Sequence, residues 1–434
     1  MVCLNYEPEK KSRMQYLRFI IDNRRFLGFG FLLSFFFSFG TTPIIALFGG
    51  EIRAEYGLSH GDFGVLYSIA NVVAAVGIVW FGRMIDQTDL RIYSVLVCGL
   101  LIASCLIMSW GSTIPFLLAA LIGFRLAGPG LMNHTVGTSM ARYFDAERGR
   151  ALAITGIGSP VCETVAPIIL VSLVVAIGWR ETWMSVSIIL AIILIPGTLW
   201  LLKGHGERHH RYLERLVDRE SEVTPEGRQW SRSEVLRNPR FYLILPAVLA
   251  PPVIIAGLFF HQVHIVESKD WNLAWWAICM GGFAIARVGI TLVSGPIIDR
   301  FGATRTLPFY IVPMVLALLV LAFIDHPVGA LFFLVLGGAS TGARIIAVNA
   351  IWAEIYGTTH LGAIRALVQG LIILAIALSP ATMGWMLDLG VTVEAIALMC
   401  IGLLALAGFL FFVYLFVSRT PSDRPPGGET AVNR

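Results

Sequence analysis

The sequence predicts an all-α polytopic membrane protein with twelve transmembrane helices in two pseudo-symmetric six-helix halves. Three observations predict this fold. Charged residues make up 14 % of the 434 residues and hydrophobic residues 56 %, whereas a soluble protein carries about 25 % charged residues. Twelve continuous apolar runs are each long enough to cross a bilayer. Several short motifs recur at an offset of 213 residues.

The composition excludes several classes of protein. The low charge and the 27 Phe, 11 Trp and 43 Gly residues do not suit a secreted disulfide scaffold, a disordered chain or a nucleic-acid-binding protein. The six cysteines form no Cys-x-x-Cys pair and have no histidine at metal-ligand spacing. We therefore expect free thiols, no metal site, no cofactor and no nucleic-acid partner.

The apolar runs divide the chain into two halves. Continuous runs predict helices rather than a barrel, because backbone polar groups inside lipid must be paired within their own segment. We expect a cytoplasmic tail over 1–25, a six-helix half over 26–202, a cytoplasmic linker over 203–239, a second half over 240–418 and a disordered cytoplasmic tail over 419–434. The runs lie at 26–48, 63–85, 92–112, 114–141, 150–176, 181–202, 240–265, 273–298, 306–324, 328–353, 362–387 and 393–418.

The basic residues predict the orientation. If both termini are cytoplasmic, 26 of the 32 Lys and Arg residues lie in cytoplasmic segments and three lie outside. Cytoplasmic loops carry such an excess because of the positive-inside rule. The net charge of +4 is then explained by loops that face anionic lipid. We expect a multi-pass protein of the cytoplasmic (inner) membrane with both termini inside.

An internal repeat supports a six-plus-six duplication. Two Gly-x-x-x-Asp motifs follow the second and eighth runs, a proline lies in both the fifth and the eleventh, and related tetrapeptides close the fourth and tenth. The pairs are Gly82 to Asp86 with Gly295 to Asp299, Pro167 with Pro380, and, at an offset of 212, Ala141 to Phe144 with Ala353 to Tyr356.

The Gly-x-x-x-Asp loops resemble the signature of the major facilitator superfamily. The second copy, GPIIDRFGATR, is the fuller match, while Gln87 and Asp89 depart from the pattern in the first. The passage ARYFDAERGRALAITGIGS, with the later GWRETW, is similar to the branch that holds oxalate/formate antiporters and monocarboxylate transporters. The resemblance implies a secondary transporter of a small organic anion, a mono- or dicarboxylate, that works by proton symport or anion exchange.

Four charged residues fall near the middle of predicted spans: Arg125, Arg287, Arg344 and Glu163. Each costs about 2.5–3.5 kcal/mol at a helix centre, so each is a candidate functional residue. The superfamily resemblance implies that Arg125 and Arg344 face a central cavity from opposite halves, with Glu163 close to Arg287 across the interface. Three arginines against one glutamate favour an anionic substrate, because the guanidinium fork suits a carboxylate.

The roles of these residues have alternatives. The resemblance to the monocarboxylate branch makes Arg287 the candidate substrate-binding arginine, whereas a purely structural role would be to hold the halves together through Glu163. Glu163 is either a proton carrier or a counter-ion, and an adjacent arginine favours the counter-ion because it keeps the carboxylate ionised. Arg125 and Arg344 either bind substrate or brace neighbouring helices.

The loop motifs predict gating contacts at cytoplasmic helix ends. A carboxylate there can pair with arginine or accept from helix N-termini, and such contacts can form in one conformation only. The alternative is ordinary positive-inside charge. The expected clusters are Arg83, Asp86 and Arg142 in the first half, and Asp299, Arg300 and Arg365 in the second.

Weaker candidates lie on the second and seventh spans. Asn71 and Tyr67, four residues apart, form a polar stripe that suits substrate binding. His261 and His264 share a helix face near the outer end of the seventh span. They are candidates for substrate binding or pH sensing, although histidines at a membrane interface commonly have neither role.

Two other classes of function compete with anion transport. A proton-coupled drug or multidrug exporter is the alternative, since Glu163 supplies a membrane acid, but Gly156 to Cys162 lacks the Gly-Pro-x-x-Gly-Gly pattern of that class. A membrane enzyme is disfavoured because no His-Glu-x-x-His, Gly-x-Ser-x-Gly or Walker motif occurs. We expect no enzymatic activity and a monomer whose partners are the lipid bilayer, a small organic anion and, if transport is proton-coupled, protons.

Overall fold

The fold was analysed in a computed structural model. It describes residues 7–144, 147–208, 232–356 and 361–417, with the backbone alone for residues 7–17, 232, 299 and 361–363. The tail over 419–434 and most of the predicted linker lie outside the described residues. Helices make up nearly all of the described chain, as the apolar runs predict.

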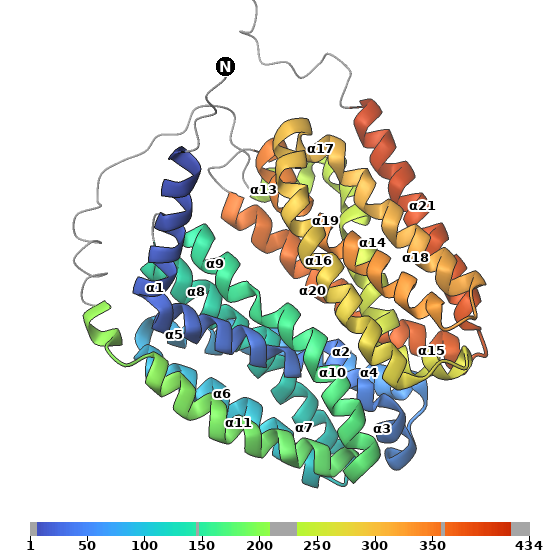
Figure 1. The fold of residues 1–434 in the computed structure, drawn as a ribbon. Coiled ribbons are helices and arrows are strands. Elements are labelled where there is room, and N and C mark those ends of the chain that lie inside the picture. The colour runs from blue at the N-terminus through green and yellow to red at the C-terminus, as the bar shows by residue number, and fades with distance from the viewer. Residues whose placement is uncertain (1–6, 145–146, 209–231, 357–360, 418–434) are drawn as a thin grey trace, which may run out of the picture.

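The helices form two bundles, one before and one after the segment around residue 220 (Figure 1). The first bundle contains α1 (Glu7–Phe36), η1 (Phe37–Gly40), α2 (Thr42–Ile45), η2 (Ala46–Phe48), α3 (Gly49–Tyr56), α4 (His60–Phe81), α5 (Met84–Gln87), α6 (Leu90–Trp110), α7 (Ile114–Arg125), η3 (Leu126–Met132), α8 (Asn133–Tyr143), α9 (Arg148–Gly156), α10 (Gly158–Ile177) and α11 (Trp179–Leu201). The second contains α13 (Arg232–Arg237), α14 (Pro239–Phe260), α15 (Gln262–Ser268), α16 (Leu273–Phe301), α17 (Ala303–Thr306), η4 (Leu307–Tyr310), α18 (Ile311–Phe323), α19 (Val328–Tyr356), α20 (Leu361–Asp388) and α21 (Val393–Val417).

Eleven helices in the described part of the chain are long and apolar enough to cross a membrane. The first predicted span is instead a bent pair: segments Arg18–Gly40 and Thr42–Tyr56 meet at 48°, and counting the pair as one span gives twelve. Thr41 is extended at the bend, and Pro43 begins the next helical turn, where a proline lacks no needed hydrogen bond. The polar stretch before Phe26 is largely helical, because α1 starts at Glu7.

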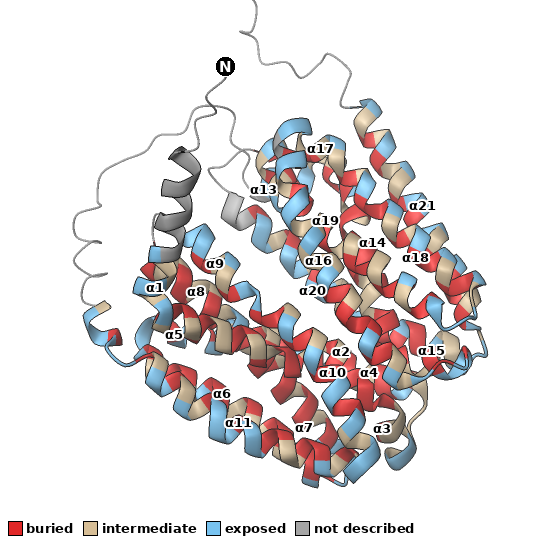
Figure 2. Ribbon diagram, viewed as in Figure 1, coloured by how far each residue is buried: buried red, intermediate tan, exposed pale blue. Residues whose placement is uncertain are grey.

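The distribution of buried and exposed residues suits a protein surrounded by lipid. Buried residues lie where helices meet, while many residues on the outward surfaces are exposed (Figure 2). Those surfaces carry large apolar side chains, such as Val175 at 84 % and Phe416 at 74 % exposure. Exposed apolar surface on this scale marks a membrane-facing protein.

The two halves meet most closely at one end of the bundle. We call the end where α1 begins and α21 ends the terminal face, and the opposite end, where α4 begins and α20 ends, the distal face (Figure 1). Near the distal face, a Cβ added to Gly64 of α4 would lie 2.5 Å from the Pro380 carbonyl oxygen of α20. A Cβ on Gly384 would lie 2.5 Å from the His60 carbonyl oxygen. Glycine thus permits backbone-to-backbone packing between the halves.

A hydrogen-bonded carboxylate reinforces this contact. The Asp388 side chain, at the end of α20, accepts from the backbone N–H groups of His60 at 3.0 Å and Gly61 at 2.7 Å. These N–H groups open α4 and have no partner within that helix. Gln262, fully buried, donates to the Pro43 carbonyl at 2.7 Å and accepts from Trp276 at 2.8 Å. The distal face is closed by specific polar contacts as well as by small residues.

Gly64→Ala tests the close packing of α4 and α20. Its methyl group would meet backbone atoms that cannot move independently, so we expect a loss of about 1–3 kcal/mol of stability, as for other overpacked sites. Gly99→Ala is the matched control, because a Cβ at Gly99 on α6 meets nothing within 4 Å. The measurement is the apparent melting temperature in detergent, and equal values for the two variants would contradict the close approach.

Candidate functional site

An ion pair joins the two halves at mid-depth in the membrane. Arg287 of α16 donates to Glu163 of α10, with Nη2 at 2.8 Å from Oε2 and Nη1 at 3.3 Å from Oε1. The side chains are 19 % and 9 % exposed. Two parallel N–H to oxygen bonds use the planar guanidinium fork fully. The expected proximity of these two residues is present, while the role of each in transport stays a prediction.

A short chain of hydroxyl groups holds the Glu163 carboxylate. Ser159, one turn earlier on α10, donates to Glu163 Oε1 at 2.7 Å. Ser38 of η1 donates to Ser159 Oγ at 3.4 Å. These serines supply polar partners that a buried carboxylate needs. Neither serine was predicted as a site residue, although the spacing of Ser159 and Glu163, four residues apart on one helix, was a usable signal.

Arg125 lies in a polar cluster within the first half. Its Nε donates to Asn71 Oδ1 at 2.6 Å, and its Nη1 donates to the Gly40 carbonyl at 3.1 Å. Its guanidinium carbon lies 5.7 Å from the centre of the Tyr67 ring, within the range of a cation–π contact. The structure therefore brings together three of the predicted substrate-binding residues.

Local backbone irregularities make the Arg125 cluster possible. Arg125 is directly followed by the π-helical segment η3, which contains Pro129. Proline removes a helical N–H, and single π turns are frequent at functional sites. A Cβ on Gly128 would lie 2.6 Å from the Phe37 carbonyl oxygen, so the irregular segment and the broken first helix pack backbone to backbone.

Tyr67 connects the cluster to the interface between the halves. Its hydroxyl donates to Thr42 Oγ1 at 2.9 Å, and its carbonyl accepts from the Asn71 amide at 2.9 Å. Its ring packs against Phe260 of α14 with centroids 4.7 Å apart. A change in the packing of the halves therefore acts on Tyr67, and through Tyr67 on Asn71 and Arg125.

Arg344 lies in the second half beside Tyr310. The two side chains interact electrostatically, and Tyr310 itself is 2 % exposed. Tyr310 donates to the Ala247 carbonyl of α14. Among the described residues, no hydrogen bond or ion pair reaches the Arg344 guanidinium. Its predicted position opposite Arg125 across a cavity stays a prediction, and its described neighbour is Tyr310.

The charges at mid-depth are unequal. Glu163 neutralises Arg287, whereas neither Arg125 nor Arg344 has a carboxylate within 4.0 Å in the described part of the chain. An arginine remains ionised at any physiological pH. Two guanidinium groups that have no acidic partner among the described residues therefore lie inside the bundle, one in each half.

The first predicted gating cluster is partly present. Arg142, at the end of α8, forms an ion pair with Asp86 of α5 and also donates to the Ile85 carbonyl at 3.5 Å. Arg83 is directed elsewhere: its Nε donates to the Val79 carbonyl at 3.1 Å, and its guanidinium lies over the Trp80 ring. The structure thus brings together two of the three residues.

The second predicted cluster is arranged differently. The Asp299 side chain lies outside the described residues. Arg300 lies over the Phe301 ring, and Arg365 donates to the Asn349 carbonyl. Glu354, which the sequence analysis did not select, accepts from the backbone N–H of Ala303 at 2.7 Å and of Thr304 at 3.3 Å at the start of α17.

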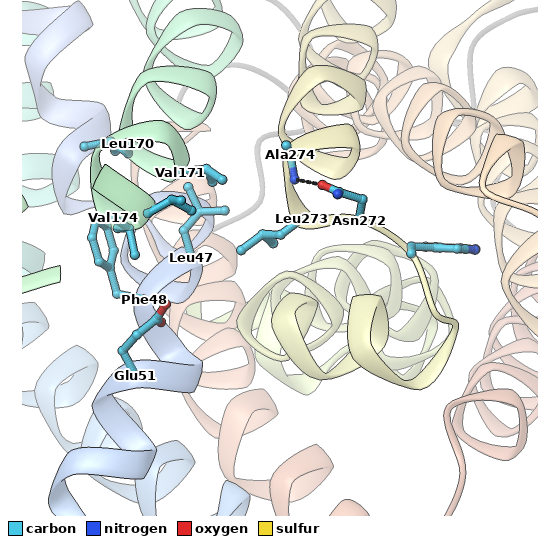
Figure 3. A pocket seen from close by; sticks show the side chains of 11 residues that line it. Leu47, Phe48, Glu51, Leu170, Val171, Val174, Asn272, Leu273 and Ala274 are labelled. Atoms are coloured by element: carbon cyan, nitrogen blue, oxygen red, sulfur yellow. Dashed lines mark hydrogen bonds between the residues drawn. The ribbon is translucent and has the colours of Figure 1, made fainter. Parts of the chain in front are cut away.

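A cavity of about 450 Å³ lies between the halves near the distal face. Figure 3 shows Leu170 and Val174 of α10 on one side, Leu273 at the start of α16 on the other, and Glu51 of α3 below. The described residues of its lining include one carboxylate and no arginine, lysine or histidine. It therefore does not suit an anionic ligand, and it is separate from the charged residues at mid-depth.

Comparison with known proteins places the chain in a family. The sequence matches the Major Facilitator Superfamily over residues 28–335 and again over 277–433. No curated protein sequence matches it. The chain belongs to the major facilitator superfamily, and it is a membrane transporter rather than an enzyme.

Solved structures show the same fold. A mutant form of the nucleoside transporter NupG superposes with a TM-score of 0.66 at 15 % identity, covering 90 % of this chain and 99 % of its own. A bacterial homologue of the human lysosomal transporter Spinster, in an inward-facing and occupied conformation, superposes at 0.65 with 15 % identity and coverages of 90 % and 96 %. The resemblance to the oxalate/formate and monocarboxylate branch is not confirmed by these matches.

A double-mutant cycle tests the pair between the halves. Glu163→Gln or Arg287→Gln alone leaves a buried charge without its partner, which costs about 3–5 kcal/mol. The double variant removes both charges, so it should be more stable than the sum of the single losses implies. The measurement is the apparent melting temperature of the purified protein.

The pair formed by Glu55 and Arg180 near the distal face is the control. Glu55 is 42 % exposed, so its cycle should give a coupling of about 0–1 kcal/mol. Strictly additive losses at Glu163 and Arg287 would show that the two side chains do not interact.

Proposed function

We propose that this transporter moves a small organic anion, a mono- or dicarboxylate, by alternating access, as a proton symporter or an anion exchanger. The observation that carries the proposal is the unbalanced arginine charge at mid-depth. Arg125 and Arg344 have no acidic partner among the described residues. Because charges inside a bilayer are costly, such residues commonly mark a substrate or ion pathway. A bound carboxylate would supply the missing negative charge.

Arg287 adds a site where a substrate can compete with an internal carboxylate. Its guanidinium already binds Glu163 in a two-bond geometry that a substrate carboxylate can reproduce. Exchange of one carboxylate for the other would loosen the connection between the halves as substrate binds. This supports a substrate role for Arg287, with Glu163 as its counter-ion or as the group that takes up a proton when displaced.

The cluster around Arg125 would position the substrate. Asn71 and Tyr67 hold the guanidinium and offer an amide and a hydroxyl close to it. His261, the remaining candidate, donates from Nε2 to the Pro380 carbonyl of α20 rather than joining this cluster. We therefore assign substrate binding first to Arg125 and its two partners, together with Arg344 and Arg287.

The membrane orientation follows from the basic residues. We propose a monomer in the cytoplasmic membrane with both termini in the cytoplasm, which makes the terminal face cytoplasmic and the distal face external. The positive-inside rule supports this orientation. With this orientation, the proposed gating contact between Asp86 and Arg142 lies at the cytoplasmic end. The other proposed gating residues lie at the same end: Arg83, Asp299, Arg300 and Arg365.

The drug-exporter alternative requires an acidic side chain that can bind a cation. Glu163 is the membrane acid that suggested this alternative, and its two oxygens are occupied by Arg287 and Ser159. A cationic substrate would also have to approach two arginines that no carboxylate in the described part of the chain neutralises. The anion proposal is therefore preferred.

A carboxylate screen tests the proposal. A ligand that binds only the folded protein stabilises it by about 2.7 kcal/mol at 100 times its dissociation constant. We expect one or more mono- or dicarboxylates to raise the apparent melting temperature and to be taken up into proteoliposomes. Arg125→Gln and Arg344→Gln should each need about tenfold more ligand, a loss of about 1.4 kcal/mol.

Arg237→Gln is the control for that screen. Arg237 is an exposed arginine on α13, away from the mid-depth charges, so its variant should bind as the unchanged protein does. Carboxylate binding that is equal in all three variants would refute the anion site. Stabilisation by lipophilic cations instead of carboxylates would favour the exporter.

A further inference from the structure

Three histidines from both halves meet at the distal face. We call His60, His261 and His264 the distal histidine cluster. The ring centroid of His60, on α4, lies 4.5 Å from that of His264 on α15 and 5.7 Å from that of His261. His60 belongs to the first half and the others to the second. The cluster therefore exists as a unit only while the halves are in contact at this face.

A hydrogen bond fixes the protonation state of His60. Arg53 Nη1 lies 3.1 Å from His60 Nε2. A guanidinium has donors and no acceptor, so Nε2 must accept this bond and cannot carry a proton. His60 is therefore neutral in the closed arrangement. A protonated ring would place a second cation against Arg53 and break the bond.

Charged groups from three elements act on the cluster. Arg53 of α3 acts on all three histidines. Glu267 of α15 acts on His264, and Asp388 of α20 acts on His60. The Asp388 carboxylate is already bound by the backbone N–H groups of His60 and Gly61. The Arg53 guanidinium, at hydrogen-bond distance from His60, thus disfavours protonation of the histidines. The two carboxylates that favour protonation are either more distant or already bound.

The membrane-spanning helix α14 ends at Phe260, earlier than the predicted span, so His261 and His264 lie beyond it, and both favour the neutral form. Burial lowers the pKa of His261 to about 4, against its hydrogen bond with the Pro380 carbonyl. Burial and then the Arg53 charge lower the pKa of His264. In a separated, hydrated face both would return toward an ordinary value of about 6.5. The closed face therefore binds fewer protons than the open face, and falling pH favours opening.

We propose that the distal histidine cluster is a proton-binding site whose occupation opens the distal face. A proton from the compartment on that side binds Nε2 of His60 and replaces the hydrogen bond from Arg53. The His60 imidazolium then faces His264 of the second half, whose ring centroid lies 4.5 Å from its own. When His264 is protonated as well, the two charged rings repel one another across the interface, and α4 separates from α15 and α20. When the face closes, the proton returns to water and the bond from Arg53 forms again.

This inference rests on the proposed alternating-access transport and names the proton as the ion that controls it. It also gives a reason for proton and anion to arrive from the same side. An open face that carries Arg53 with protonated His60 and His264 presents positive charge to the solution, and such charge raises the encounter rate of an anion.

The test measures the distance across the distal face without any substrate. Spin labels are placed at Ser112→Cys in the first half and Leu389→Cys in the second, both exposed near this face. Cys3→Ser is included, and the five cysteines in the described residues are buried. The purified full chain in nanodiscs is measured between about pH 8 and about pH 5, the range in which histidine titrates.

We expect the ratio of open to closed distal face to rise about tenfold or more as the pH falls, as one pKa unit of difference requires. In His60→Gln this ratio should rise less than in the unchanged protein, because the part of the rise that comes from position 60 should fall below about twofold. Glutamine can accept the bond from Arg53 but does not titrate. His326→Gln is the matched control, since His326 is an exposed histidine in the loop between α18 and α19 near the same face. It should respond as the unchanged protein does.

Two results would overturn the proposal. One is a distance distribution that does not change with pH in the unchanged protein. The other is an equal pH response in His60→Gln and in His326→Gln. The readout needs no ligand, so a failure of the carboxylate screen leaves it intact. Conversely, carboxylate binding in a protein whose distal face ignores pH would support the transport proposal and refute this one.

Discussion

The pairing of Glu163 with Arg287 is the contact on which the arrangement of the charged residues depends. A charge at the centre of a bilayer is costly unless it is paired or reaches water. This pair satisfies one acid and one base with two hydrogen bonds and does so across the boundary between the halves. Glu163 is the one carboxylate that the sequence places among the mid-depth arginines. Because it is already paired with Arg287, the charges of Arg125 and Arg344 need other partners.

The interface between the halves combines contacts of different strength along its depth. Near the distal face, α4 and α20 approach through glycines, and the Asp388 carboxylate binds the open end of α4. At mid-depth, the contact is an ion pair with partial exposure. Backbone packing has a sharp dependence on distance, whereas an ion pair tolerates rotation of long side chains. A rocking motion that opens the distal face must therefore break the backbone packing of α4 with α20, but it can preserve the ion pair of Glu163 with Arg287.

Much of the architecture could be predicted from the sequence. The apolar runs and the spacing of the repeats predicted a twelve-helix fold in two halves, and the resemblance to the superfamily implied that Glu163 and Arg287 would be close. Asp86 and Arg142 could be paired because carboxylate and guanidinium at neighbouring helix ends attract. The bend in the first span, the Gly40 carbonyl that accepts from Arg125, and the role of Asp388 were not predicted. The bend is a change in the course of the backbone, and the contacts of Gly40 and Asp388 use backbone groups. No pattern of side chains in the sequence reveals which backbone groups are left unpaired.

The equivalent positions Arg142 and Glu354 give the two halves different chemistry at the terminal face. Arg142 joins its half through an ion pair with Asp86, while Glu354 binds backbone N–H groups that open α17. Dissolved salt screens an exposed ion pair, whereas a carboxylate that binds directly to backbone N–H groups is affected less. The duplicated halves therefore need not loosen together as ionic strength rises. A protein built from two similar bundles thus uses a charge–charge contact at the terminal face of one half and a charge–dipole contact at that of the other, so salt acts more strongly on the first contact than on the second.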